Sequence, residues 1–269
     1  MLAAALYLLT GLFAGAIAGL LGVGGGIVNV PALDFLFRRQ GIAADPAFHL
    51  ALGTSLAAIV FTGASAAWAH YRRGKVDVAF GWRAGVGGIG GSVLGGYLAS
   101  LLPAAALKPA FAAILLASAI QLLVDQGAPR EGPCGGGCKK AYVIGALAGV
   151  LAGFFGIGGG IAAVPLMLWW GRFDAPRAVA TSTLMIVILG AFGAGTYVVA
   201  GWRETAGVPW ALGNVHLLAL IFLASAAIIT APYGAALAHR ISPLRLKRIF
   251  ALALLAVSAR FFWTLFEKG

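Results

Sequence analysis

Apolar residues fill eight long stretches of this chain, and short polar segments separate them. Their approximate ranges are 2–37, 46–70, 80–102 and 104–124, then 141–171, 176–200, 210–238 and 249–266. A helix that crosses a membrane needs about 20 mostly apolar residues. The pattern therefore predicts an all-α polytopic membrane protein, with four apolar segments in each half of the chain.

The first stretch of each half is too long for one crossing, and a glycine run interrupts it. These runs are 22-GVGGG-26 and 156-GIGGG-160. Glycine costs about 1 kcal/mol in a helix relative to alanine, so the helix is expected to break there. Asp45 before Pro46, and Asp174 before Pro176, are predicted to cap the helices that follow.

Composition supports the membrane interpretation. Hydrophobic residues make up 61% of the 269 positions and charged residues only 10%, with a mean hydropathy of +0.96. A soluble domain carries about a quarter charged residues, so a soluble globule, a disordered chain and a coiled coil are excluded. The net charge of +11 lies in short basic clusters between apolar stretches. That pattern is typical of loops beside anionic lipid, so we expect a multi-pass plasma-membrane protein and no nucleic-acid partner.

The two halves of the chain resemble each other. Residues 11–33 match 145–167 at 12 of 23 positions. Two later blocks keep the same order: 53–56 matches 180–183, and 98–111 matches 237–250. Three ordered blocks indicate an internal duplication.

A polar linker, residues 125–140, divides the first transmembrane repeat, 1–124, from the second, 141–269. It contains Cys134 and Cys138, whose spacing could close a small disulfide or hold a soft metal. Two thiols without a nearby histidine make an incomplete site, so ordinary linker residues are the simpler interpretation. We expect no metal and no cofactor.

The distribution of Lys and Arg favours a re-entrant course for both glycine-broken stretches. If all eight stretches cross, the basic residues divide almost evenly between the two sides. If the glycine-broken stretches return to their own side, thirteen lie on one side and six on the other. The six are Arg38, Arg39, Lys108, Arg203, Arg260 and Lys268. The second arrangement satisfies the positive-inside rule and makes the two halves inverted repeats with three transmembrane helices each.

The glycine runs are the first candidate for an anion site. Glycine lets backbone N–H groups approach a ligand, and a helix that starts there directs its positive dipole end toward it. The alternative is that the glycines only permit a tight turn and close packing. The candidate binding residues are Gly24, Gly25, Gly26, Gly158, Gly159 and Gly160.

Polar side chains beside both runs could add hydrogen bonds to an anion. Four of them form hydroxyl pairs, Thr54 with Ser55 and Thr181 with Ser182. Hydroxyls in membrane helices often bond instead to a carbonyl one turn back. Asn29 is a further candidate, but its counterpart in the second half is Ala163, so any role is one-sided.

The carboxylates suggest neither proton coupling nor catalysis. All eight lie at the ends of apolar stretches or in loops, whereas proton-coupled transporters often place one in mid-membrane. The sequence contains no nucleophile–base pair, zinc motif or P-loop. We therefore expect no enzyme.

The duplicated G-x-G-G-G-I-x-x-V-P blocks, with 53-GTSL-56 and 181-TST-183, resemble the TauE/SafE sulfite exporter family. The resemblance covers nearly the whole chain. It implies a plasma-membrane protein that transports sulfite, sulfonates or related small organic anions, usually outward. The family's motifs correspond to the glycines and hydroxyl pairs named above, together with Gly22 and Gly156.

We therefore expect a secondary transporter, with export as the favoured direction. Both glycine-broken segments would meet at one anion site, and the two halves would expose it alternately. The partners would be a small anionic substrate and the lipid bilayer. The sequence leaves open whether the chain forms a homo-oligomer. The alternatives are a passive anion channel and a membrane scaffold or sensor without flux.

Overall fold

The computed structural model describes residues 2–124, 138–202, 205 and 207–266, and this part of the chain is almost entirely helical. The first half contains α1 (Leu2–Leu21), α2 (Gly26–Arg39), α3 (Ala44–Tyr71), α4 (Val78–Gly87), α5 (Ile89–Ser100) and α6 (Ala104–Val124). The second half contains α7 (Cys138–Phe155), α8 (Gly160–Trp169), α9 (Ala175–Ala200), α10 (Leu217–Ala238) and α11 (Pro243–Phe266). Strands β1 (Ala211–Leu212) and β2 (Val215–His216) form a short antiparallel hairpin before α10. The predicted all-α class is confirmed.

Each glycine run ends one helix and reverses the chain before the next. The φ angles of Gly22, Gly24 and Gly25 are 70°, 74° and 83°. The equivalent angles of Gly156, Gly158 and Gly159 are 69°, 74° and 82°. Glycine adopts this left-handed backbone without the steric penalty that other residues meet. The predicted helix breaks are confirmed, and the two turns share one backbone form.

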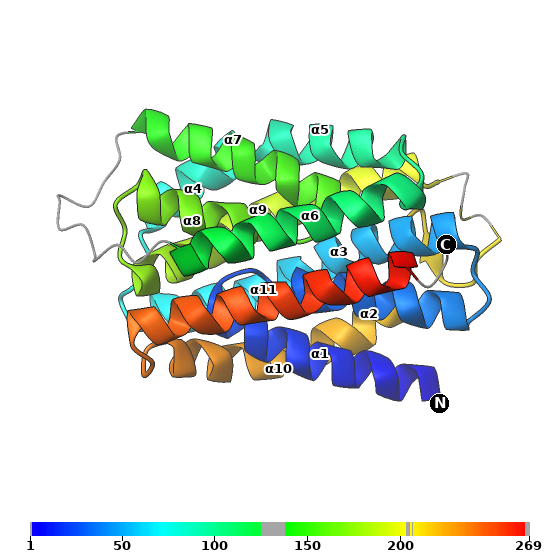
Figure 1. The fold of residues 1–269 in the computed structure, drawn as a ribbon, viewed down its shortest axis with the longest axis horizontal. Coiled ribbons are helices and arrows are strands. Elements are labelled where there is room, and N and C mark those ends of the chain that lie inside the picture. Colours follow the sequence, from blue (N-terminus) through cyan, green and yellow to red (C-terminus); the bar gives the residue numbers. More distant parts are fainter. Residues whose placement is uncertain (1, 125–137, 203–204, 206, 267–269) are drawn as a thin grey trace.

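The glycine-broken stretch of each half enters the molecule and returns to the end from which it came. In Figure 1, α1 starts and α2 finishes at the right-hand end, whereas α7 starts and α8 finishes at the left-hand end. Helices α3 and α9 pack against each other between these two pairs. This course of the chain agrees with the return that the basic residues favoured, while re-entry into a membrane and the inverted orientation of the halves stay predictions.

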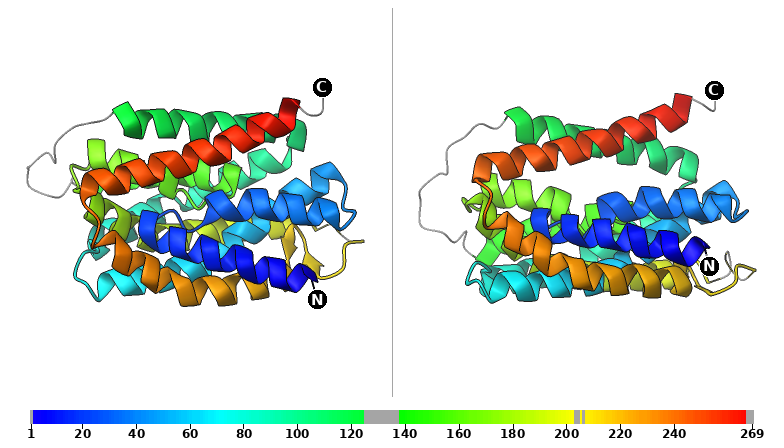
Figure 2. Two further views of the ribbon diagram at one scale, coloured as in Figure 1. Left: turned by 60° about the horizontal axis from the view of Figure 1, so that its bottom comes forward. Right: turned by 90° about the horizontal axis from the view of Figure 1, so that it is seen from below.

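Equivalent helices of the two halves pack reciprocally. Helix α1 lies against α10, and α7 lies against α4 and α5. Figure 2 shows α1 alongside α10, and α6 alongside α11 on the opposite face. Glycines permit this closeness, because a Cβ at Gly19 or Gly149 would overlap the backbone of the facing helix. A duplication would account for the pattern, and the repeat boundaries stay a prediction.

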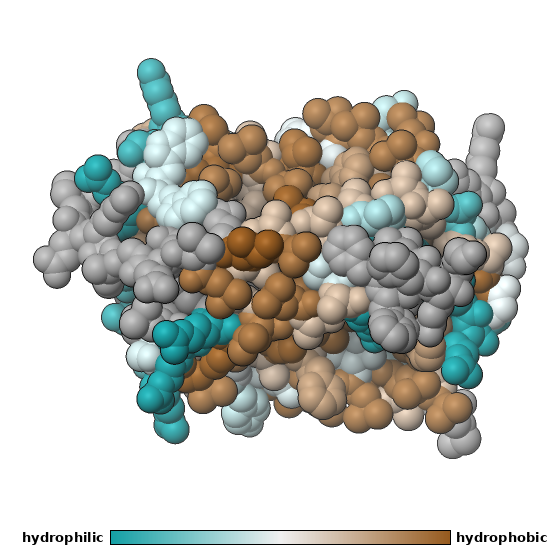
Figure 3. All heavy atoms as spheres, viewed as in Figure 1, coloured by the Kyte–Doolittle hydropathy of each residue, from teal (hydrophilic) through white to brown (hydrophobic). Residues whose placement is uncertain are grey.

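Apolar residues cover the middle of one face of the molecule. Figure 3 shows hydrophobic spheres across the centre of one face and hydrophilic spheres toward both ends. Large apolar side chains such as Phe13, Trp82 and Val199 are more than half exposed. Within the described ranges, five helices are long and apolar enough to cross a membrane, namely α1, α3, α7, α9 and α10. These features are those of a multi-pass membrane protein.

The structure corrects three local predictions. The stretch 80–102 forms two helices because the chain breaks at Gly88, and the stretch 210–238 begins with the hairpin rather than with a helix. Asp174 is the N-cap residue of α9 as predicted, although its side chain makes no capping hydrogen bond, and Ala43 rather than Asp45 is the N-cap residue of α3. The Asp45 carboxylate instead accepts a 2.6 Å hydrogen bond from the N–H of Ala104, which ties the start of α6 to the start of α3.

Replacement of Gly26 by alanine should destabilise the fold strongly. A Cβ at this position would lie 2.5 Å from the Cα of Ile157, and backbone cannot yield as a flexible side chain does. Overpacking costs about 1–3 kcal/mol and occasionally more. We expect the unfolding temperature of Gly26→Ala in detergent to fall by several degrees. Gly90→Ala is the control, because a Cβ there meets nothing within 4 Å; equal unfolding temperatures would contradict this close contact.

Candidate functional site

The two glycine turns touch each other inside the molecule. A Cβ at Gly160 would lie 2.6 Å from the carbonyl oxygen of Gly22, and a Cβ at Gly26 would meet Ile157 equally closely. We call this contact between residues 22–26 and 156–160 the glycine junction. Helices α2 and α8 start at the junction, and neither has a side-chain cap. The junction therefore brings together two helix N-termini, each the positive end of a helix dipole.

A serine from the opposite half holds each glycine turn. The Ser55 hydroxyl of α3 donates a 2.7 Å hydrogen bond to the carbonyl oxygen of Gly156. The Ser182 hydroxyl of α9 donates a 2.8 Å hydrogen bond to the carbonyl oxygen of Gly22. Both serines are fully buried. The two predicted serines are therefore brought to the predicted glycines, through bonds that stabilise the junction.

The threonines beside these serines hold the starts of two other helices. The Thr54 hydroxyl oxygen accepts a 2.8 Å hydrogen bond from the N–H of His216, the N-cap of α10. The Thr181 hydroxyl oxygen accepts a 3.1 Å hydrogen bond from the N–H of Asp77, the N-cap of α4. Each hydroxyl pair thus joins three segments of the chain. A substrate contact for these four side chains stays a prediction.

Asn29 is the polar side chain of the predicted site that the fold leaves without a partner. It lies on the first turn of α2, where its N–H donates to the carbonyl of Gly25. Its side chain is fully buried, and neither amide atom has a hydrogen-bond partner among the described residues. A buried amide without a partner costs about 1–3 kcal/mol, so such groups call for a functional explanation. The Tyr197 hydroxyl and the Asn214 amide share this property.

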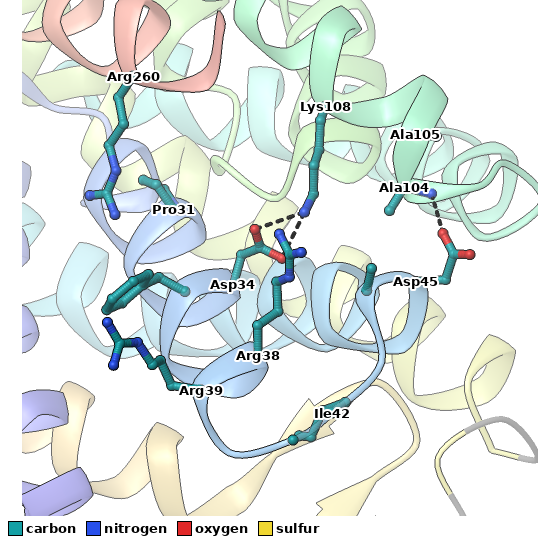
Figure 4. Close-up of a pocket in the computed structure, with 13 residues that line it drawn as sticks. Pro31, Asp34, Arg38, Arg39, Ile42, Asp45, Ala104, Ala105, Lys108 and Arg260 are labelled. Atoms are coloured by element: carbon teal, nitrogen blue, oxygen red, sulfur yellow. Dashed lines mark hydrogen bonds and ion pairs between the residues drawn. The ribbon is translucent and has the colours of Figure 1, made fainter. Parts of the chain in front are cut away.

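A cavity of about 770 Å³ lies between α2, α6 and α11 (Figure 4). We call it the α2–α6–α11 cavity. Inside it, the Lys108 ammonium donates to both carboxylate oxygens of Asp34 at 2.8 and 3.0 Å. Both side chains are almost buried, with 12% and 11% of their surfaces exposed. Sequence reasoning missed this pair, because its members lie on different helices and only the fold brings them together.

A histidine pair lies near the other end of α3. His70 Nε2 is 2.9 Å from the carbonyl oxygen of Gly19, and His70 Nδ1 is 2.9 Å from His239 Nε2. A carbonyl only accepts, so His70 carries its proton on Nε2 and accepts at Nδ1 a hydrogen bond from His239. The pair links α10 to α1 close to the first glycine turn. Cys138 is exposed at the start of α7, and Cys134 lies outside the described residues.

Comparison with known proteins identifies the family. The sequence profile described as "Sulfite exporter TauE/SafE" matches residues 7–261. The chain belongs to the TauE/SafE family. Both glycine turns, both hydroxyl pairs and the α2–α6–α11 cavity fall within the matched residues.

Relatives of this TauE/SafE protein from distant organisms carry transporter names. A "Probable membrane transporter protein" of Haemophilus influenzae is 29% identical over 96% of this chain and 97% of its own length. One from Methanocaldococcus jannaschii is 28% identical over 95% of this chain and 94% of its own length. YunE of Bacillus subtilis, with the same description, is 30% identical over 71% of this chain and 77% of its own length. No solved structure matches the chain. The protein is therefore a membrane transporter of the TauE/SafE type.

Loss of either junction serine should weaken the fold. Ser55→Ala and Ser182→Ala each remove the donor to a buried glycine carbonyl, which costs about 1–3 kcal/mol. We expect both variants to unfold at lower temperature than the wild type in detergent. Ser225→Ala is the matched control, since its exposed hydroxyl bonds only within its own helix. Unfolding of all three variants at the same temperature would contradict the role of the serines.

Acidification should destabilise the protein partly through His239. Its burial, and next the positive charges of Arg73 and Lys75, lower the pKa of His239 below the ordinary value of 6.5. The unfolded chain then binds this proton at higher pH than the folded chain. The stabilising effect is therefore complete above about pH 6.5 and lost as pH falls. We expect the unfolding temperature to drop between about pH 7.5 and 5 more for the wild type than for His239→Gln; equal drops would exclude His239 as the cause.

Proposed function

We propose that this protein is a secondary transporter of sulfite, organosulfonates or related small organic anions in the plasma membrane. We propose export as its direction and the glycine junction as its central binding site. The observation that carries the proposal is the buried, unpartnered amide of Asn29 beside two converging helix N-termini. Such a site accepts an anion without a buried cation.

The chemistry of the junction suits an oxyanion. Backbone N–H groups from residues 24–26 and 158–160 and the Asn29 amide N–H₂ are hydrogen-bond donors, and the oxygens of sulfite or a sulfonate accept from them. The positive ends of α2 and α8 favour negative charge at the same place. The hydroxyls that hold the turns fix the donors in position, which limits the ordering needed when an anion binds.

Alternating access would use the reciprocal packing of the two halves. Both glycine turns are buried and in contact in this structure, so the proposed cycle requires them to separate before an anion enters. Opening toward one end or the other would require α1–α2 or α7–α8 to shift against α3 and α9. Discontinuous helices that meet near the midplane perform this role in many secondary transporters.

Counterflow in proteoliposomes tests the proposal. Vesicles loaded with unlabelled sulfite should accumulate radiolabelled sulfite in a saturable manner, and competing sulfonates and carboxylates should rank the substrate class. Leakage that does not saturate and shows no counterflow would indicate a channel. Absence of any sulfite flux from folded, inserted protein would overturn sulfite transport and leave either a different anion or a scaffold or sensor without flux.

Asn29→Leu should abolish most of this exchange and leave the fold intact. Leucine has a similar volume and removes only an amide that has no protein partner. We expect the exchange rate to fall at least about tenfold, as for the loss of a charge-assisted hydrogen bond, with no drop in unfolding temperature. Asn214→Leu is the matched control, because it removes another unpartnered amide in the hairpin turn, outside the junction. Wild-type exchange by Asn29→Leu would overturn the assignment of the site.

A further inference from the structure

The α2–α6–α11 cavity is lined by most of the Lys and Arg residues predicted for its side of the membrane, which has few of them. Four of the six Lys and Arg predicted for that side line it, namely Arg38, Arg39, Lys108 and Arg260. The carboxylates in its lining are Asp34 and Asp45. The lining therefore has a formal excess of positive charge. Positive charge in a concave, partly apolar site concentrates anions.

Arg38 is a cation in this cavity that no described carboxylate neutralises. Asp34 and Lys108 neutralise each other, and Asp45 is bonded to the N–H of Ala104. Arg38 is half-buried and makes no ion pair or side-chain hydrogen bond with other described residues. Figure 4 shows its side chain extending from α2 toward Asp34 and Lys108. Its planar guanidinium matches the paired oxygens of a sulfonate, carboxylate or phosphate group.

The rest of the lining suits an apolar body attached to the anionic group. Pro31, Phe35 and Ile42 contribute apolar surface. The guanidinium groups of Arg39 and Arg260 lie 5.1 and 5.7 Å from the centre of the Phe35 ring. A volume of about 770 Å³ lies within the range of sites that bind small organic ligands.

Helix α2 connects this cavity to the glycine junction. The helix starts at Gly26 in the junction, and Pro31 in the cavity lies five residues farther along it. At 1.5 Å per residue, the two sites are about 7–8 Å apart along the helix axis. An anion that leaves the junction toward this end would meet Pro31 and then Asp34 with its partner Lys108.

We propose that the α2–α6–α11 cavity is a second oxyanion-binding site, with Arg38 as its principal ligand. Its occupant is an anionic group on a small apolar body. An organic sulfonate or carboxylate supplies this chemistry, and so does the phosphate of a lipid headgroup. The binding site itself does not depend on the proposed function. Only the identification of its occupant with the transported anion rests on that function.

Equilibrium binding of radiolabelled ethanesulfonate to the purified full chain in detergent tests the proposal. The Asn29→Leu background weakens the contribution of the junction. In that background we expect binding to persist, to weaken about tenfold to a hundredfold on Arg38→Gln, and to be partly restored by Arg38→Lys. Arg172→Gln is the matched control, since Arg172 holds the same repeat position at the other end of the molecule. In the otherwise wild-type chain, Arg38→Gln should lower the stoichiometry from two to one.

Phosphatidylglycerol added to the same assay distinguishes the two sources of the anionic group. Competition by this lipid, or binding of it alone that Arg38→Gln abolishes, would support the site with a lipid as its occupant. Unchanged affinity of both ligands in Arg38→Gln would overturn the site. If Arg38-dependent binding is found but the wild type shows no sulfite counterflow, sulfite transport is refuted and the cavity site stands.

Discussion

The rest of this structure depends on the direct contact of two glycine backbones at its centre. Gly26 and Gly160 lie so close to the opposite turn that a single added carbon would not fit. Neither turn would hold alone, because each consists of left-handed glycines that lose much chain entropy on folding. Ser55 and Ser182 offset that loss with buried hydrogen bonds to the glycine carbonyls. Through these bonds the position of each re-entrant pair fixes the long helix of the other half.

Lipid imposes a second constraint, since a backbone polar group inside the bilayer must find its partner within the protein. The junction satisfies this demand with hydroxyl side chains from α3 and α9. The hydroxyls of Thr54 and Thr181 accept hydrogen bonds from the backbone N–H groups of the N-cap residues of α10 and α4. The serine hydroxyls donate to carbonyl groups of the glycine turns. The four hydroxyls all have hydrogen-bond partners within the protein, whereas the side-chain amide of Asn29 has none among the described residues. That contrast makes Asn29 a better candidate for a ligand contact than the hydroxyls.

Sequence predicted the glycine turns and the hydroxyl pairs because duplication makes each signal appear twice. Their bonding partners could not be predicted, because Ser55 and Gly156 are 101 residues apart and meet only in the fold. The same holds for Asp34 and Lys108, which look like ordinary charges at segment ends. The break at Gly88 was missed because that helix is rich in glycine throughout. The unpartnered state of Asn29 is a property of packing, which no local pattern reports.

Duplication alone cannot account for directional transport, because two identical halves would offer the same site to both sides of a membrane. The differences between the halves therefore matter more than their likeness. In the alignment of the two halves, Asn29 corresponds to Ala163 and Asp34 corresponds to Leu168. Both differences lie on α2, so the added polarity follows one re-entrant helix from the junction to one end. In the proposed cycle the shared scaffold supplies the movement, and these substitutions on α2 distinguish the two sides.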